Sequence, residues 1–333
     1  MTMGKRINSI DIVRLLCAIL VVAIHTQAIV WFKDLPNGSI QIITRIAVPF
    51  FFCTSGFFLE KSYQRKGIAA IAASLKKTIR IYITLSAVYF AVIFIQSPSL
   101  LHESKKWMLI DFLFHGSYYH LWYIVGVCYA FAAIYLIARL QLLRILFPLS
   151  VVLYAIGLLG TSYYGFGSHI PGLQILFDNG WFTTIRRIFL MGIPFVTLGW
   201  TIAEGRIKWR FSGKRLILAT IVVALLFVAE IVVVTVSGVA RSIVITIGLY
   251  PLMFVIFMCC LDYPNSAMTK EAAVCKETAD FMYFYHPIVI LLISKYIESR
   301  FLLFIAATAL CLTLGYGYYL AKKGRSNEHL SNQ

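Results

Sequence analysis

The chain has 333 residues, of which 60% are hydrophobic and only 13% are charged, and its mean hydropathy is +0.82. Soluble proteins carry roughly a quarter charged residues, so this composition excludes an ordinary soluble domain. The formal net charge of +16 would suit a soluble nucleic-acid-binding protein. Here, however, the basic residues lie in short connections between apolar segments, which indicates membrane lipid, and not nucleic acid, as the partner.

Ten apolar segments are long enough to cross about 30 Å of hydrocarbon as helices. They lie at residues 10–32, 40–60, 77–96, 119–138, 145–161, 181–203, 215–236, 240–261, 279–297 and 300–320. No low-complexity linker separates them, and no stretch has the composition of a second, soluble domain. The sequence therefore predicts an all-α polytopic membrane protein in which residues 1–333 form a single domain.

Lysine and arginine are distributed unevenly between the two ends of these segments. Most of the 30 basic residues fall on one side, in connections such as "EKSYQRKG" (60–67) and "EGRIKWRFSGKR" (204–215). Because cytoplasmic loops are enriched in these residues, we expect both termini in the cytoplasm of a multi-pass plasma-membrane protein. The first segment is longer than a secretory signal core, and no small-residue cleavage pattern follows it, so we expect it to stay as a membrane span.

The first segment contains "DIVRLLCAILVVAIHT", with three ionisable side chains at Asp11, Arg14 and His25. At 100° per residue they fall on one helical stripe about 60° wide, so they face one place in the protein. Ionisable groups inside a membrane are costly unless paired, so all three are candidate site residues. Arg14 and His25 are separated by roughly 16 Å along the helix and cannot touch, whereas Asp11 and Arg14 can pair.

Plainer interpretations stay open for this stripe. In the plainer interpretation of Arg14, its guanidinium pairs with Asp11 and reaches the inner membrane surface, and it has no further role. His25 can be a neutral histidine that is hydrogen-bonded to a backbone carbonyl or to a neighbouring helix. The functional interpretation is a shaft, in which Arg14 binds an anion near the entrance and His25 supplies a group that titrates near neutral pH.

The second segment contains "RIAVPFFFCTSGFFLE", which begins with Arg45. We expect Arg45 at a depth comparable with His25, although it can also extend to the membrane surface. Pro49 predicts a kink in this helix. The residues of "TSGFF" (54–58) form a small-residue patch where another helix or a ligand can approach closely.

The connection "FHGSYYHLWYI" (114–124) is rich in aromatic and histidine side chains, among them Tyr119, His120 and Trp122. One interpretation is an aromatic belt at the membrane interface. The other is a stacking and hydrogen-bonding surface for a polar acceptor such as a sugar. The two interpretations can hold for different residues of the segment.

Two further ionisable groups lie within apolar segments. Glu230 is a candidate site residue, but pairing with Arg241 or another basic group explains it equally well. His286, in "YFYHPIVI" (283–290), is either a functional imidazole or a bonded structural group. The seven cysteines lie mostly inside the predicted spans and show no metal-ligand spacing, so we expect apolar fillers and no metal site.

Taken together, these motifs resemble the acyltransferase family 3 membrane proteins, which O-acetylate carbohydrates and related acceptors. The matching features are Asp11-x-x-Arg14, His25, Arg45, Phe50-Phe51, Ser55-Gly56-Phe57, "YHLWY" at 119–123 and "YFYHPIVI". The resemblance implies a bundle of ten helices with cytoplasmic termini. Pro49 departs from the commonest pattern, and this variant also looks like the membrane domain of serine racemases linked to vancomycin resistance. We expect no soluble racemase domain within these 333 residues.

The resemblance also implies roles for individual residues. It makes His25 the catalytic histidine and Arg14 its partner on the same helix, and we count Asp11 with them as a candidate catalytic residue. It places Arg45, Phe50 and Phe51 in the acyl-donor site. The other candidates for binding donor or substrate are Ser55, Tyr119, His120, Trp122, Glu230 and His286.

Two functions follow from these residues. The first is acyl transfer, in which cytoplasmic acyl-CoA (acetyl-CoA), drawn in by Arg14, donates to a hydroxyl of an extracytoplasmic carbohydrate or small acceptor. In that mechanism His25 is either a general base or an acylated nucleophile. The second is a carrier for a small amino acid such as L-serine, in which Arg45 holds the carboxylate and His25 or Glu230 moves protons. The sequence does not name the acceptor.

Overall fold

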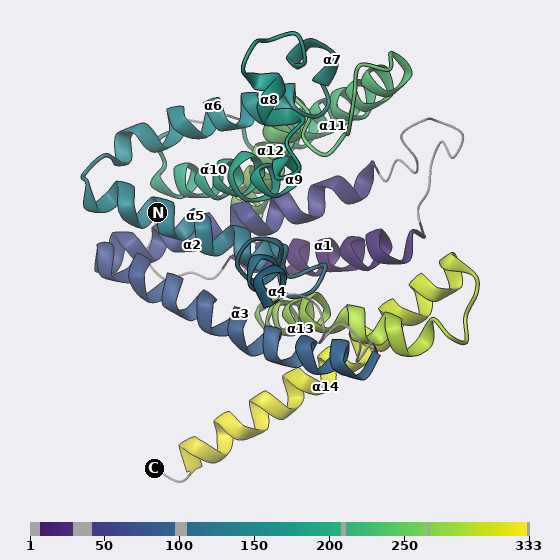
Figure 1. The fold of residues 1–333 in the computed structure, drawn as a ribbon. Coiled ribbons are helices and arrows are strands. Elements are labelled where there is room, and N and C mark those ends of the chain that lie inside the picture. Colours follow the sequence, from purple (N-terminus) through teal and green to yellow (C-terminus); the bar gives the residue numbers. More distant parts are fainter. Residues whose placement is uncertain (1–6, 29–41, 97–104, 208–210, 265–266, 332–333) are drawn as a thin grey trace. The chain divides into compact units, whose positions relative to one another are not determined.

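The computed structural model describes residues 7–28, 42–96, 105–207, 211–264 and 267–331. Within these ranges the regular secondary structure is entirely helical (Figure 1). Because these helices are also strongly apolar, the protein is an all-α polytopic membrane protein, as the composition predicts.

The longer helices are α1 (Asn8–Thr26), α2 (Ala47–Lys66), α3 (Ile68–Gln96), α5 (Trp122–Arg139), α6 (Leu146–Leu159), α10 (Ile193–Glu204), α11 (Gly213–Val236), α12 (Leu249–Asp262), α13 (Thr269–Ile293) and α14 (Arg300–Ser331). The shorter ones are η1 (Ile43–Ile46), α4 (Lys105–Ile110), η3 (Asp111–His115), η4 (Leu143–Ile145), α7 (Tyr164–Gly167), α8 (Leu173–Phe177), α9 (Phe182–Ile185) and η5 (Arg186–Gly192). The η3 and η5 segments are π-helical, and η1 and η4 are 3₁₀ turns.

Each of the ten predicted spans overlaps a helix in the described part of the chain. Seven of the described helices are long and apolar enough to cross a membrane, and Leu143–Leu159 and Leu249–Asp262 are shorter apolar helices. The total of ten crossings and the cytoplasmic position of the termini stay predictions.

Several boundaries differ from the predicted ones: α3 begins at Ile68 instead of residue 77, α2 ends at Lys66 instead of residue 60, and α14 ends at Ser331 instead of residue 320. Three other differences have a visible physical reason. Helix α12 begins at Leu249 instead of residue 240, because the preceding segment makes turns around Gly238, whose φ is +70°. Helix α13 begins at Thr269, ten residues before the predicted 279, because its first turns are polar and carry no hydropathy signal. Helix α1 ends at Thr26, where Gln27 takes a left-handed conformation that stops the helix.

Pro49 lies in the first turn of α2, directly after the 3₁₀ turn η1. A proline at that position removes an N–H group that has no partner within the helix, so it is tolerated there. The predicted kink therefore coincides with the change from η1 to α2 and does not interrupt α2 itself.

The chain forms two compact units. Unit 1 contains residues 1–50, 211–221 and 255–333, and unit 2 contains residues 51–210 and 222–254. Three helices, α2, α11 and α12, contribute residues to both units.

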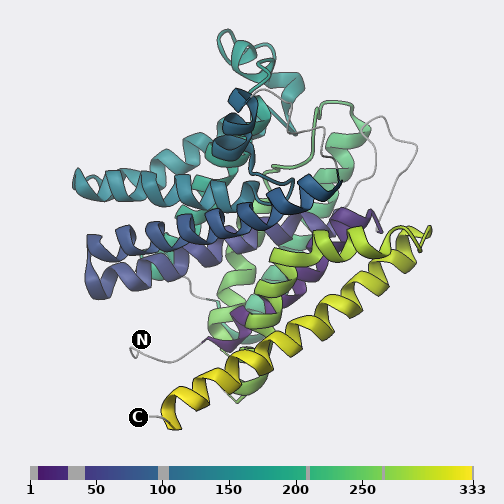
Figure 2. The same ribbon diagram turned by 60° about the horizontal axis from the view of Figure 1, so that its bottom comes forward.

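In unit 1, α13 packs against both α1 and α14 (Figure 2). Gly315 of α14 allows a close approach, since a Cβ atom there would crowd Thr278 of α13. Near the same helix pair, Lys322 Nζ lies 2.7 Å from a carboxylate oxygen of Glu277. One glycine and an ion pair thus hold α14 along α13.

In unit 2, α5 packs against α3 and η5, and α6 packs against α10 and η5. The small-residue patch predicted in α2 is a helix contact. A Cβ atom on Gly56 would overlap the carbonyl oxygen of Val196 in α10, and one on Gly199 of α10 would overlap the carbonyl oxygen of Cys53. Glycine is therefore required on both helices for the backbones to approach this closely.

We predict that Gly199→Ala destabilises the protein by at least about 1–3 kcal/mol, the usual cost of overpacking, because the obstructing atoms belong to rigid backbone. The measurement is the free energy of unfolding of the purified protein in detergent. Gly317→Ala in α14 is the matched control, since a Cβ atom there meets no atom within 4 Å. Equal stability of the two variants would contradict the close helix crossing.

Candidate functional site

Arg14 lies between two carboxylates in unit 1. Its guanidinium is 3.6 Å from Asp11 on its own helix, which confirms the pairing expected from their spacing. It also donates a hydrogen bond to Asp280, on α13. Asp11 is 4% exposed, so its charge needs a nearby cation to be tolerated. The two carboxylates and the guanidinium together carry a net charge of −1.

His25 stacks on His286 of α13, with ring centroids 5.1 Å apart and an angle of 27° between the ring planes. His286 is 0% exposed. Both histidines were candidates from the sequence, but nothing in their positions along the chain indicated that they meet. The structure therefore turns two single candidates into one imidazole pair.

The proline after His286 explains how its ring is held. Pro287 lies inside α13 and has no N–H group, so it cannot donate to the carbonyl oxygen of Tyr283, four residues earlier. The ring of His286 does so instead: Nδ1 lies 3.1 Å from that oxygen and 3.0 Å from the carbonyl oxygen of Met282. Because a carbonyl only accepts, Nδ1 carries the proton, and in the neutral ring Nε2 carries the lone pair.

Helices α1 and α13 run in the same direction at these contacts. Arg14, in the first half of α1, meets Asp280 at the middle of α13, and His25 meets His286 further along both helices. One more contact agrees with this direction: Asn8 donates a hydrogen bond to the hydroxyl of Thr269 at 3.4 Å, at the first turns of α1 and α13. In the ten-span prediction successive spans alternate in direction, so the first and ninth spans, which contain α1 and α13, run parallel.

Arg45 lies in η1, which packs against α1 in unit 1. Its Nε atom is buried and has no hydrogen-bond partner among the described residues. Phe50, also in unit 1, is buried against Phe257 of α12, with ring centroids 5.6 Å apart. Phe51, the next residue of α2, is counted in unit 2.

In unit 2, the hydroxyl of Ser55 is bonded within the protein. It donates to the carbonyl oxygen of Phe51 at 2.9 Å and lies 3.0 Å from the hydroxyl of Tyr123. Tyr123 also lies 3.1 Å from the same carbonyl oxygen. These contacts tie α5 to α2 and give Ser55 a packing role.

The aromatic segment before α5 presents its residues to different neighbours in unit 2. His120 is 2% exposed and lies edge-on to Tyr89, with ring centroids 4.7 Å apart. The ring of Trp122 lies under the guanidinium of Arg187, 5.2 Å from its centroid. Tyr119, in contrast, is 47% exposed. Only Tyr119 of the three resembles an interfacial belt residue.

Glu230 of α11 binds the start of α12. Its carboxylate oxygens accept from the backbone N–H groups of Ile247 and Gly248, each at 2.6 Å, and from the hydroxyl of Tyr163 at 2.9 Å. Burial and the hydrogen bond to Glu230 raise the pKa of Tyr163 to about 12, so it remains a donor. The sequence left open a pairing of Glu230 with Arg241. In the structure Glu230 instead accepts from the backbone N–H groups that precede α12. Arg241 pairs with Asp178 instead.

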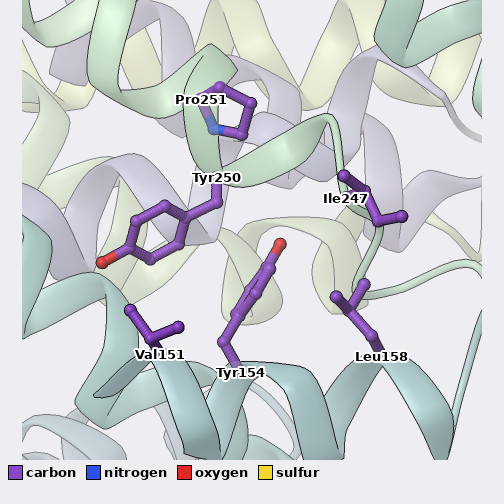
Figure 3. A pocket seen from close by; sticks show the side chains of 6 residues that line it. All are labelled: Val151, Tyr154, Leu158, Ile247, Tyr250 and Pro251. Atoms are coloured by element: carbon purple, nitrogen blue, oxygen red, sulfur yellow. The ribbon is translucent and has the colours of Figure 1, made fainter. Parts of the chain in front are cut away.

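Unit 2 also contains two pockets. An apolar pocket of about 220 Å³ lies between α6 and the start of α12 (Figure 3). Val151, Tyr154 and Leu158 reach it from α6, opposite Ile247, Tyr250 and Pro251. A second, polar pocket of about 320 Å³ lies at the start of α9.

The candidate residues therefore divide between the units. Unit 1 holds Asp11, Arg14, His25, Arg45, Phe50 and His286, and unit 2 holds Phe51, Ser55, Tyr119, His120, Trp122 and Glu230. Sequence reasoning missed Asp280, although a carboxylate six residues before His286 is a visible signal. Within the described residues, no group of three His, Cys, Asp or Glu side chains could hold a metal ion.

We predict that Asp280→Asn destabilises the protein by about 1–3 kcal/mol, less than a fully buried pair would cost, because the Asp280 side chain is 32% exposed. Unfolding in detergent, compared with Arg14→Gln and with the double variant, measures the coupling. The double variant should lose less stability than the sum of the two single ones. Arg144→Gln, at an exposed position, is the control. Strict additivity would contradict a direct Arg14–Asp280 interaction.

We predict that Glu230→Gln destabilises the protein by about 1–2 kcal/mol, because one oxygen and the charge that strengthens both backbone bonds are lost. The measurement is the same unfolding assay, with Glu298→Gln at an exposed position as the control. If Glu230 instead served only to move protons, the variant would be as stable as the control.

Comparison with known protein families matches residues 7–320 to acyltransferase 3, described as an acyltransferase domain. Two relatives from Enterococcus faecalis, both named amino-acid racemase, are 33% identical over 180 residues and 29% identical over 318 residues. These matches cover 54% and 89% of this chain, but 25% and 43% of the relatives.

A serine/alanine racemase from Enterococcus gallinarum is 29% identical over 176 residues, which are 49% of this chain and 24% of that protein. The chain thus spans less than half the length of the curated relatives that it matches. No solved structure matches it.

Proposed function

The chain belongs to acyltransferase family 3, and on this premise we propose that it is a membrane O-acyltransferase of the plasma membrane. The donor is acyl-CoA, most simply acetyl-CoA, on the cytoplasmic side. The acceptor is a hydroxyl group of an extracytoplasmic carbohydrate or small molecule. The observation that carries the proposal is the stacked pair of His25 and His286.

Acyl transfer to a hydroxyl needs a base and a stabilised oxyanion. In the proposed reaction, His25 takes the proton of the acceptor hydroxyl while the hydroxyl oxygen forms a bond to the thioester carbonyl carbon. The carbon–sulfur bond then breaks, and the proton passes from His25 to the leaving thiolate of CoA. The products are the ester and free CoA, so no oxidant or reductant is required.

His286 supports this role as a positioning residue. Its Nδ1–H is fixed by two carbonyl oxygens, so the ring cannot rotate, and its flat face holds the ring of His25. A base that is held in one orientation loses less entropy when the reaction begins. The alternative in which His25 briefly carries the acyl group uses the same geometry, because acylation also needs an oriented ring nitrogen.

Arg14 has a different part in this proposal from the one the sequence suggests. Its guanidinium already contacts the carboxylates of Asp11 and Asp280. We assign it to hold α1 against α13 and so keep the two histidines in register. Arg45 is the better candidate for the oxyanion or the donor, because its buried Nε has no partner among the described residues.

The proposal predicts that His25→Ala abolishes transfer of labelled acetyl from acetyl-CoA, a loss of at least about 100-fold, because general-base catalysis contributes that much. His286→Ala should lower the rate through misorientation of His25, while His286→Asn, which keeps a donor to the helix carbonyls, should recover part of it. The measurement is transfer by the purified protein in lipid nanodiscs to a panel of sugar and small hydroxyl acceptors.

His169→Ala is the matched control, since His169 is exposed and bonded only within its own turn. Its variant should keep full activity. Full activity of His25→Ala would overturn the proposed mechanism. Absence of both binding and transfer of acetyl-CoA by the wild-type protein would overturn the proposed function.

A second candidate function is a carrier for a small amino acid such as L-serine. The names of the relatives, amino-acid racemase and serine/alanine racemase, favour it. In this function Arg45 would hold the carboxylate of the amino acid. Saturable uptake of L-serine into proteoliposomes without acyl-CoA would favour the carrier over acyl transfer.

A further inference from the structure

Three basic residues lie close together on α3, in unit 2. Lys76, Lys77 and Arg80 fall within five consecutive positions, and all three side chains are exposed. Among the described residues, none of the three forms an ion pair with an acidic side chain. They are the only charged residues in the sequence of α3, which therefore carries three positive charges and no negative one.

Helical geometry places the three basic residues on the side of α3 that faces away from its packing contacts. At 100° per residue, they lie within an arc of about 100° around the helix axis. The buried residues that follow them lie within a similar arc on the opposite side of the helix. These buried residues are Tyr82, Leu85, Ser86 and Tyr89. The basic side chains therefore point away from the interior of unit 2.

The outward face of α3 is otherwise apolar. Phe94 and Ile95 lie on it further along the helix and are 53% and 79% exposed. Before the basic residues, positions 68–75 contain only Ile, Ala, Leu and Ser. In a helix that spans a membrane, an exposed apolar face contacts lipid, because burial against protein does not cover it. The three positive charges are thus directed at lipid.

The position of the basic residues along α3 matches a membrane surface. Lys76 and Gln96, the last residue of the helix, are separated by about 30 Å at 1.5 Å per residue. The hydrocarbon core of a bilayer is also about 30 Å thick. With the end of α3 at one surface, Lys76 and its two neighbours lie at the phosphate groups of the other surface. The distribution of lysine and arginine predicts that this is the cytoplasmic surface.

We propose that Lys76, Lys77 and Arg80 bind the headgroup of an anionic phospholipid. Phosphate is the anion that the membrane provides at this depth, and ammonium and guanidinium groups both donate charge-assisted hydrogen bonds to it. Each basic side chain near an anionic membrane surface strengthens binding several-fold. The acyl chains of the bound lipid lie along the apolar remainder of the same face. This inference concerns lipid binding and does not depend on acyl transfer.

The test is a titration of the purified full chain in detergent with phosphatidylglycerol, followed by native mass spectrometry. Phosphatidylcholine with the same acyl chains is the comparison, because its headgroup has no net charge. We expect phosphatidylglycerol to bind at least about tenfold more tightly, and the triple variant Lys76→Gln, Lys77→Gln, Arg80→Gln to bind both lipids within about twofold of each other. Raising the salt concentration should weaken the preference of the wild type, since salt screens charges at the surface.

A matched triple variant, Arg65→Gln, Arg139→Gln, Arg144→Gln, removes the same charge from exposed positions at or near helix ends of unit 2. It should keep the preference for phosphatidylglycerol. Lys76→Arg with Lys77→Arg keeps the charge and should also keep the preference, whereas a role in folding alone would give no such dependence on charge.

Three results would overturn the proposal. The first is an undiminished preference in the triple variant of α3, and the second is an equal loss of preference in the matched variant. The third is displacement of phosphatidylglycerol by soluble glycerol 1-phosphate, which has the phosphate but no acyl chains and would indicate a site for a soluble anion.

Discussion

Ionisable side chains inside apolar helices must find partners, and this constraint organises unit 1. Arg14 cannot lie in hydrocarbon alone without a cost of several kcal/mol. Its contacts with Asp11 and Asp280 remove that cost and, because Asp280 lies 266 residues away, join the first long helix to α13. The same two helices then bring His25 to His286. An ion pair and, further along both helices, an imidazole pair therefore set how α1 and α13 align.

The same constraint appears in unit 2 with a different solution. Glu230 is satisfied by two backbone N–H groups and a tyrosine, and no basic side chain is needed. Backbone N–H groups at the start of a helix have no partner within that helix, so a carboxylate there satisfies both sides at once. This capping explains why α12 begins at Leu249 and why the apolar residues before it are not helical.

Proline and glycine act in this protein through the hydrogen bonds and side chains that they lack. Pro287 leaves a carbonyl of α13 without its usual donor, and His286 supplies one from its side chain. Gly56 and Gly199 omit the Cβ atoms that would separate α2 from α10. Lipid tails are as apolar as the helix surface, so helices gain little free energy by burying apolar side chains against one another. Close backbone contacts and hydrogen bonds therefore determine which helices associate. The catalytic proposal depends on the hydrogen bond that His286 makes near Pro287, because it fixes the ring against which His25 stacks.

Much about this protein was determined by the sequence itself. Hydropathy and charge are local properties, so the composition alone predicts an all-α polytopic membrane protein, and the motifs around Arg14, His25 and Arg45 indicate a family that matches residues 7–320. The pairing of Asp11 with Arg14 follows from helical spacing in the same way.

The tertiary structure alone decided which distant groups meet. The contacts of Arg14 with Asp280 and of His25 with His286, the capping role of Glu230, and the polar pocket at the start of α9 all join parts of the chain that are far apart in sequence. Periodicity predicts the face of a helix on which a side chain lies, but not the helix that it faces. That choice depends on how all the helices pack, because each polar group takes the partner that packing brings within reach.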